Sequence, residues 1–267
     1  MNGVSFFFKK SDSVYGLVAY DEIILYDRQE DTTYRDTFAT SIDTIVSIWG
    51  EQIYAIAYDT PHDYIEALRI LKRYNLGKVR LVNEFQCAAL SCINLDDCSE
   101  RLLHYTKDSK SFWIEIGGGV IECIGEEIDK GPFEEVEIKD STNYIEELFK
   151  GGYLMKTLLE GRLDVVVMHS LPYNMGIEIV RDGESLGLIV LVEKSCTIPL
   201  KKSEIVNMKN DDELYFTIDD EKLRIPSSII EFDGNPELEG EICVDIDADS
   251  MVMLEVTKKR VMLKDLV

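Results

Sequence analysis

The sequence predicts a protein in two parts, a mixed α/β N-terminal part and an all-β C-terminal part joined by a short apolar linker. Residues 53–82 read as strand, helix and strand, an order typical of an α/β layer. Residues 172–267 alternate short β-branched runs with turn signals, which favours an antiparallel β-sandwich. Between these parts, the apolar tetrapeptide 165–168 is too short for a core helix, so it either docks or adds a strand.

The N-terminal part opens with three apolar runs, at residues 4–8, 14–20 and 22–26. A polar stretch at residues 9–13 separates the first two runs and reads as a turn. Strands that follow one another closely in sequence usually pair with each other, so we expect an antiparallel meander here.

The strand–helix–strand segment begins with a uniformly apolar run at residues 53–58, which is typical of a buried strand. Thr60 followed by Pro61 predicts the start of a helix, and apolar residues recur at helical spacing through residue 74. A second strand is expected at residues 79–82, followed by a short helix around residues 85–92.

A glycine triplet interrupts the apolar residues of 112–122. A strand that enters Gly117, Gly118 and Gly119 and leaves as another strand makes a tight turn. The backbone N–H groups of such a turn can face a phosphate, although a plain β-turn has the same sequence. Both interpretations stay open at this point.

In the C-terminal part, β-branched runs at residues 177–180 and 186–192 predict a first hairpin with Asp182 and Gly183 at its turn. Further turn signals predict the later strand ends. They are Asn210-Asp211, Asp219-Asp220, residues 233–236 and Asp249-Ser250. No helix of useful length is expected after Val256.

The formal charge of −23, from 28 basic and 51 acidic residues, makes nucleic acid and anionic membranes improbable partners. No apolar run approaches the roughly 20 residues that span a bilayer, and residues 1–3 begin no leader, so we expect a cytoplasmic protein. The six cysteines form no CxxC pair and the three histidines have no metal-ligand spacing. We therefore expect reduced thiols and no metal site.

The quoted segments resemble, in order, those of the 70-kDa heat-shock (DnaK-type) chaperone family. LPYNMGIEIV (171–180), CTIPLKKSEI (196–205) and VDIDADSMVMLEV (244–256) are similar to strands of its peptide-binding β-sandwich. RLVNEFQCAALSC (80–92) with the glycine triplet resembles the second phosphate loop of its actin-like ATPase domain. The helical segment 142–164 resembles the last helix of that domain.

The resemblance implies a miniature member with a reduced, actin-like (ribonuclease H-like) nucleotide-binding-type domain at residues 1–163. An interdomain linker at residues 164–171 and a peptide-binding β-sandwich at residues 172–267 would follow. The linker proper would be Val165, Val166, Val167 and Met168. The family closes its sandwich with a helical lid, and residues 260–267 do not match one.

Departures from the family's phosphate loops argue against catalysis. Where the family's first loop carries an aspartate, a glycine and two threonines, the residues here are Phe7, Phe8, Lys9, Lys10 and Ser11. In the second loop the resemblance leaves Glu115, Gly117, Gly118 and Gly119 as nucleotide-binding candidates, but Val120 lacks the hydroxyl of the family's threonine. The N-terminal part is also less than half the length of the family's ATPase domain. We expect no significant ATPase activity and no required cofactor, with ATP and Mg²⁺ as the possible ligands.

The resemblance also implies a peptide pocket. Its residues would be Ile177, Ile179, Val180, Val206, Asn207, Phe216 and Ile218. An alternative is that Ile177, Val206 and Ile218 fill the sandwich core, because inward alternation produces the same pattern. Lys209 stands near a position where the family has a small apolar arch residue, which disfavours a covered groove.

Three functions follow from these features. The first is a chaperone-like protein that binds extended apolar peptide segments or a partner strand through the sandwich, with a degenerate ATPase domain. The second is a reduced nucleotide switch that couples ATP to peptide binding through the linker. The third is a scaffold that uses the fold for assembly alone.

Overall fold

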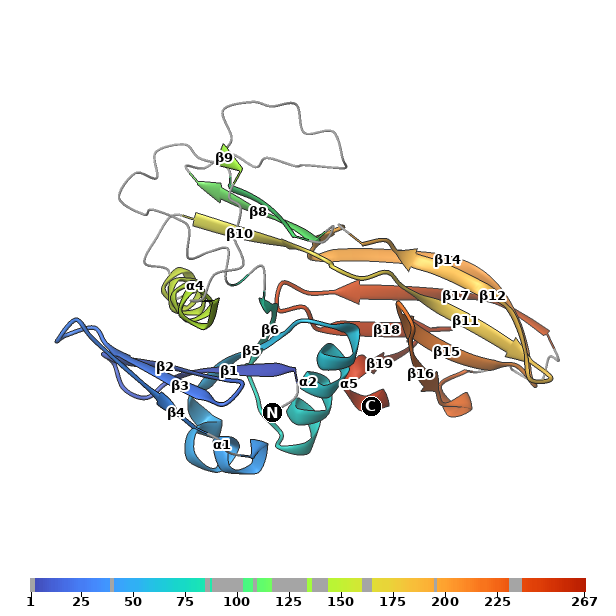
Figure 1. Ribbon diagram of the computed structural model, residues 1–267. Coiled ribbons are helices and arrows are strands. Elements are labelled where there is room, and N and C mark those ends of the chain that lie inside the picture. The colour runs from blue at the N-terminus through green and yellow to red at the C-terminus, as the bar shows by residue number, and fades with distance from the viewer. Residues whose placement is uncertain are drawn as a thin grey trace. The chain divides into compact units, whose positions relative to one another are not determined.

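A computed structural model describes residues 3–38, 41–84, 87, 103–107, 110–116, 134–135, 144–159, 165–194, 196–230 and 237–267 (Figure 1). The chain divides into two compact units, Met1–Ser170 and Leu171–Val267. The first unit combines helices with mixed sheets and the second consists almost entirely of antiparallel strands. The coarse prediction of an α/β part followed by a β part is confirmed.

The main sheet of the first unit has the strand order β4-β3-β2-β1-β5-β6. The predicted meander is present, since β1 (Val4–Lys9), β2 (Val14–Ala19) and β3 (Glu22–Asp27) pair antiparallel in sequence order. A fourth strand, β4 (Thr32–Thr37), extends it and was not predicted. All six β4 residues are exposed, so this strand carries no apolar alternation that a sequence pattern could reveal.

The predicted strand–helix–strand segment is also confirmed. Strand β5 (Ile53–Tyr58), helix α2 (Pro61–Arg73) and strand β6 (Arg80–Asn83) form a βαβ unit in which β5 and β6 are parallel. A capping box fixes the start of α2, because the Asp63 N–H donates to Thr60 Oγ1 at 3.2 Å and the Thr60 N–H donates to Asp63 Oδ2 at 3.1 Å. An unpredicted helix, α1 (Ile42–Trp49), precedes β5.

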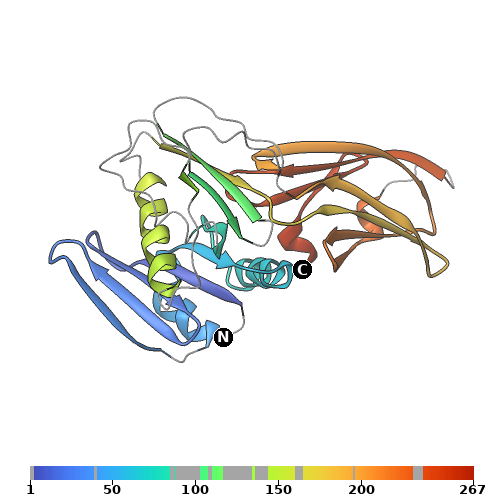
Figure 2. The same ribbon diagram turned by 45° about the horizontal axis from the view of Figure 1, so that its top comes forward.

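Helix α4 (Tyr144–Leu159) packs on one face of the main sheet (Figure 2). Its Tyr153 ring meets the ring of Tyr15 edge-on, with 4.8 Å between centroids. Gly152 lets α4 lie close to the Phe7 ring of β1, because a Cβ atom at position 152 would be only 2.1 Å from Cε1 of Phe7. The Tyr54 hydroxyl donates to the carbonyl of Gly152 at 3.1 Å. Aromatic side chains therefore fill the space between the helix and the sheet.

In a second sheet of the first unit, β10 (Val165–Ser170), β8 (Lys110–Ile116), β7 (Leu103–Lys107) and β9 (Glu134–Glu135) are neighbours in that order. The apolar tetrapeptide is thus a strand. It pairs antiparallel with β8, with Val166 opposite Glu115 and Met168 opposite Trp113. Of the two expectations for this segment, strand addition is the one that the backbone adopts.

The second unit is a sandwich of two antiparallel four-stranded sheets, in the orders β12-β11-β15-β16 and β14-β17-β18-β19 (Figures 1 and 2). The strands of the first sheet are β11 (Met175–Arg181), β12 (Glu184–Val192), β15 (Glu213–Ile218) and β16 (Glu221–Ile225). Those of the second are β14 (Leu200–Lys209), β17 (Glu237–Ile246), β18 (Val252–Val256) and β19 (Lys259–Met262). A two-residue strand, β13 (Thr197–Ile198), precedes β14.

The predicted turns lie where the sequence indicated. Asp182-Gly183, Asn210-Asp211, Asp219-Asp220 and Asp249-Ser250 each connect two strands, whereas residues 233–236 lie outside the described residues. Only short helical segments occur in this unit among the described residues, η3 (Ser227–Ile229) and α5 (Leu263–Leu266). The expectation of no long helix after Val256 therefore agrees with the structure.

Candidate functional site

The two sides of the sandwich differ in how their edge strands are protected. On one side, α5 contacts β16, β18 and β19, and η3 contacts β19. Leu263 of α5 and Ile230, just after η3, are buried there. The strands on that side are also short, five residues in β16 and four in β19. Short and covered edges are the usual protection against unwanted strand pairing.

The opposite side, formed by β12 and β14, is called here the open side. These edge strands are nine and ten residues long and contact each other, and no described strand of the second unit pairs with their outer edges. Four of the seven large apolar side chains that are exposed in the described residues belong to them. They are Leu186 and Leu188 (both 53% exposed), Val190 (43%) and Ile205 (68%).

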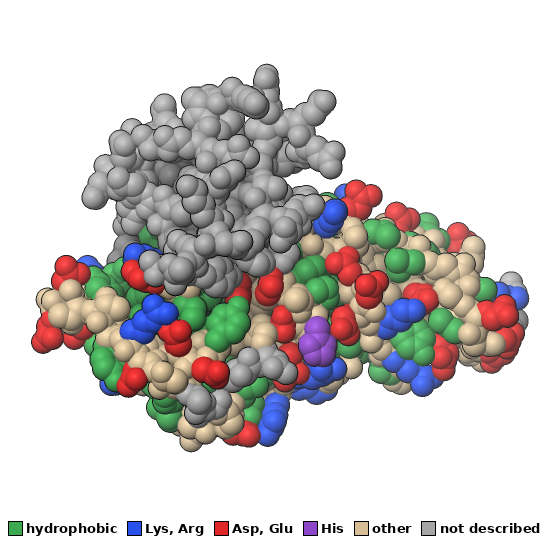
Figure 3. Space-filling view, in the orientation of Figure 1, with side chains coloured by type: hydrophobic (Ala, Val, Ile, Leu, Met, Phe, Trp, Pro, Cys, Tyr) green, Lys and Arg blue, Asp and Glu red, His purple; other side chains and the backbone are tan. Residues whose placement is uncertain are grey.

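Long edge strands with exposed apolar side chains offer a template on which a further strand can pair, and no described strand of the second unit occupies these two. Figure 3 shows apolar, acidic and basic side chains interleaved on the face of the sandwich turned to the viewer. On the open side, the exposed apolar side chains stand among exposed charged ones, such as Lys201, Lys202 and Glu204 of β14.

Of the two edges, β14 is the more regular. Its ten residues pair with β17 without interruption, from Leu200 opposite Ile246 to Lys209 opposite Glu237. The pairing of β12 with β11 shifts register twice, and Gly187 within β12 has φ +132°. A bulge twists an edge and disrupts the ladder that an added strand would follow. Strand addition is therefore favoured on β14.

The predicted peptide-pocket residues lie mainly inside the sandwich. Ile177, Phe216 and Ile218 have no exposed surface, Val206 is 3% exposed and Ile179 is 6% exposed. Val180 is half-buried, and Asn207 is exposed on β14. Burial between the sheets is what the core interpretation requires of Ile177, Val206 and Ile218.

An ion pair ties the end of β11 to the turn that follows β14. Arg181 Nε and Nη2 donate to the two carboxylate oxygens of Asp212 at 2.7 and 2.8 Å. The Lys209 backbone N–H adds a third bond, 2.7 Å to Asp212 Oδ2. Lys209 thus contributes its backbone to this connection. Because the Asp212 side chain has no exposed surface, this ion pair is a structural contact within the sandwich.

The ion pair between Arg181 and Asp212 makes the stability of the second unit depend on pH. The Arg181 guanidinium, and secondarily the Lys209 N–H, hold the pKa of Asp212 below its usual range despite burial. A carboxyl group whose pKa is lower in the folded state stabilises fully above the unfolded pKa, about 3.9, and that stabilisation is lost as the pH falls through the folded value. We expect the urea concentration at the midpoint of unfolding of the second unit to decrease when the pH is lowered below about 4. A variant without the pair should lack this part of the decline.

In the segment compared with the family's first phosphate loop, several backbone N–H groups bond within their own turn. The N–H groups of Lys10 and Ser11 donate to the Val14 carbonyl at 2.8 and 3.2 Å, and the Val14 N–H donates to Ser11 Oγ at 3.1 Å. The turn therefore uses these donors internally. Lys9 Nζ lies 5.6 Å from the centre of the Tyr15 ring and 3.7 Å from Asp12.

Aromatic packing occupies the rest of this segment. Phe7 and Phe8 are completely buried, Phe7 against α4 and Phe8 stacked on Trp49 at 4.4 Å between centroids. In the second loop, Glu115 lies on β8, and Gly117, Gly118, Gly119 and Val120 lie outside the described residues.

One buried acidic residue of the first unit was not singled out from the sequence. Glu84, directly after β6, is 2% exposed. The Ser5 hydroxyl donates to its Oε1 at 2.5 Å and the Tyr20 hydroxyl to its Oε2 at 3.1 Å. Burial and the charge of Glu84 raise the pKa of Tyr20. Both carboxylate oxygens of Glu84 thus accept hydrogen bonds from hydroxyl groups. The sequence signal that could have revealed Glu84 is an acidic residue directly after an apolar strand.

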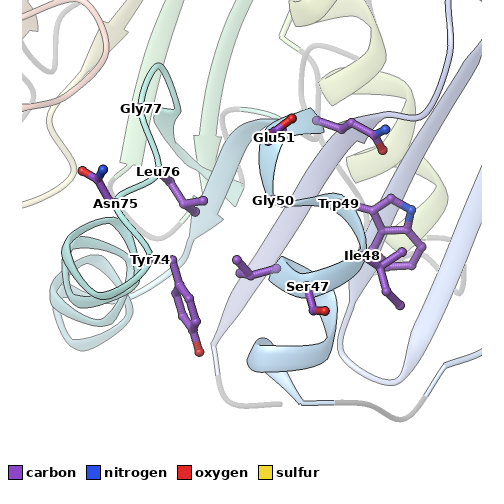
Figure 4. Close-up of a pocket in the computed structure, with 11 residues that line it drawn as sticks. Ser47, Ile48, Trp49, Gly50, Glu51, Tyr74, Asn75, Leu76 and Gly77 are labelled. Carbon is purple, nitrogen blue, oxygen red and sulfur yellow. The ribbon is translucent and has the colours of Figure 1, made fainter.

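A hollow of about 540 Å³ in the first unit lies between the C-terminal ends of α1 and α2 (Figure 4). Ile48 and Trp49 line it from α1, and Tyr74 and Leu76 from the chain after α2. No predicted site residue lines this hollow.

Among the described residues, no group of three or more His, Cys, Asp or Glu side chains is arranged to hold a metal ion. No helix in the described part of the chain is long and apolar enough to cross a membrane. Neither a scan against protein-family models nor a search of curated proteins found a match for this chain.

Proposed function

We propose that the protein is a chaperone-like recognition protein, a miniature relative of the 70-kDa heat-shock family, that binds an extended apolar segment or a partner strand on the open side of its sandwich. The observation that carries this proposal is the exposure of Leu186, Leu188, Val190 and Ile205 on two long edge strands, whose outer edges pair with no described strand of the second unit. The ATPase-type domain takes no part in a catalytic cycle under this proposal.

Physical reasons support this mode of binding. A segment that adds to a sheet edge gains main-chain hydrogen bonds of little sequence dependence, while alternate side chains supply specificity. Burying one aliphatic side chain fully contributes about 1.5–3 kcal/mol, and the side chains on the open side are about half exposed. After the entropic cost of association, the remaining affinity is modest and exchange is fast.

Nucleotide control has weaker support. The turn at Lys10–Ser11 uses its backbone donors internally, and aromatic rings fill the surrounding space. A phosphate would have to displace these bonds before it gained its own. We therefore place ATP outside the working mechanism of this protein and keep the nucleotide switch as an outcome of the test.

The test is the fluorescence anisotropy of a labelled extended apolar peptide titrated with the protein, with and without Mg–ATP. We expect saturable binding whose dissociation constant is the same in both conditions. Binding that weakens with ATP would instead support the nucleotide switch. The absence of binding in both conditions would support the scaffold.

Substitutions on the open side locate the binding surface. The double variant Leu188→Asp/Ile205→Asp should bind the peptide at least about tenfold more weakly, because it places charges where apolar contact is expected. Ile48→Asp is the matched control, since Ile48 is 52% exposed on α1 of the first unit. Equal affinities for the double variant and the unchanged protein would contradict binding at the open side.

A further inference from the structure

Strand β14 carries a short charged motif in its first half. Lys202 and Glu204 stand two positions apart, with Ser203 between them, so their side chains share one face of the strand. Both side chains are exposed. In the pairing with β17, Lys202 lies opposite Val244 and Glu204 opposite Ile242, and both of these apolar residues are completely buried. The two charges therefore meet no charged residue directly opposite them on β17.

A lysine and a glutamate in this arrangement are complementary to a second copy of themselves. When two identical strands pair antiparallel about a two-fold axis, residues equally far from the central residue, on its two sides, face each other. With Ser203 at the centre, Lys202 of each copy faces Glu204 of the other, which gives two symmetric ion pairs. No ion pair between described residues of the single chain involves either side chain.

Other central residues lose this match. A centre at Lys202 places two lysines opposite each other, and a centre at Glu204 places two carboxylates opposite each other, and like charges in these positions destabilise pairing. A centre at Ile205 places Lys202 opposite Met208, which is buried. Charge complementarity thus selects the register centred on Ser203.

The same register brings apolar surface together. Lys201 of each copy faces Ile205 of the other, and Leu200 faces Val206. Ile205 is 68% exposed in the single chain, and the methylene groups of a lysine can cover such a side chain while its ammonium group stays in water. Residues 200–206 of each copy are paired in this way, and the two sheets that contain β14 join into one continuous antiparallel sheet.

We infer that the protein forms a two-fold symmetric dimer in which the free edges of two β14 strands pair antiparallel about Ser203. This dimer goes beyond the proposed function because it needs no peptide, although a peptide strand that adds to β14 competes with the second copy. The net charge of −23 on each copy opposes the dimer. At 0.15 M salt the Debye length is about 8 Å, so charges farther apart than this are largely screened, whereas directly opposite side chains are about 5 Å apart at Cβ.

Sedimentation equilibrium in 0.15 M salt, at protein concentrations from about 10 µM to 0.5 mM, tests the dimer. We expect a monomer–dimer equilibrium for the unchanged protein. Lys202→Glu and Glu204→Lys should each weaken the dimer at least about fivefold, because each places two pairs of like charges face to face. The variant with both replacements exchanges the two charges and should return to within about twofold of the unchanged protein.

Control variants separate this register from the effect of the overall charge. Glu204→Lys makes the protein less acidic, so repulsion between the net charges alone predicts a tighter dimer for this variant. Lys78→Glu, at an exposed position in the first unit, changes the net charge by the same amount as Lys202→Glu and should weaken the dimer much less. An equimolar mixture of the Lys202→Glu and Glu204→Lys variants should form the mixed dimer, in which opposite charges face each other at both positions.

Contrary outcomes are distinguishable. A protein that sediments as a monomer at every concentration would overturn the inference and leave the proposed function standing, since the peptide titration measures that function separately. A dimer that is unaffected by both single replacements would overturn the pairing of β14 about Ser203. Recovery of the dimer in the double variant would support the inference, because misfolding of the single variants could not be reversed by a second charge change at an exposed residue.

Discussion

Replacing Ile218 by aspartate is expected to unfold the second unit. Ile218 has no exposed surface and lies on β15, opposite Met175 of the neighbouring strand β11. A carboxylate at this position has no partner, and burying such a group costs more than about 4 kcal/mol, a large share of the 5–15 kcal/mol that stabilises a typical domain. Circular dichroism and thermal unfolding of the variant would measure the loss.

Ile205→Asp is the matched control, because it makes the same chemical change at a residue that is 68% exposed. We expect this variant to keep its unfolding temperature within about 2 °C and to lose peptide affinity only. If Ile218→Asp instead folds normally and loses peptide binding, the residue lines a pocket, and the core interpretation of the predicted peptide site is wrong.

Replacing Arg181 by methionine is expected to lower the free energy of unfolding of the second unit by about 3 kcal/mol. The variant leaves the buried Asp212 carboxylate without its bidentate partner, with only the Lys209 N–H still bonded to it. Methionine keeps most of the length of the side chain, so lost packing contributes little. Urea unfolding at pH 7, followed by circular dichroism, measures the change.

Arg224→Met provides the comparison. Arg224 also pairs with a carboxylate, Glu213, but the two side chains are 66% and 41% exposed. Exposed ion pairs contribute about 0–1 kcal/mol, because water and salt screen them. Equal losses in the two variants would show that the Arg181–Asp212 pair has no special role in fastening the turns of the sandwich.

Much of the fold could be predicted because the apolar periodicity and the turn residues place the ends of helices and strands at the same positions. Thr60 and Pro61 locate the start of α2, and Asp182-Gly183 locates the first hairpin of the sandwich. Strand β4 could not be predicted, since its TTYRDT sequence has no buried face. The turn before β19 uses Thr257 and Lys258 at positive φ, which are not typical turn residues for that backbone.

The open side could not be predicted, for a different reason. Residues 186–192 have the apolar composition of a buried strand, yet Leu186, Leu188 and Val190 are exposed. Sequence alternation gives the face on which a side chain lies but not whether a strand is central or at an edge. Conversely, the resemblance gave Ile177, Phe216 and Ile218 as pocket residues, and only the packed sheets show that these side chains are enclosed.

The uncovered β12 and β14 edges also bear on how many copies of the chain coexist in solution. Long free edges with apolar side chains are sites at which identical molecules join. A net charge of −23 on each copy opposes their approach over distances comparable to the Debye length, about 10 Å in 0.1 M salt and 3 Å in 1 M salt. The net negative charge therefore opposes association of identical copies through these edges, and this opposition weakens as ionic strength rises.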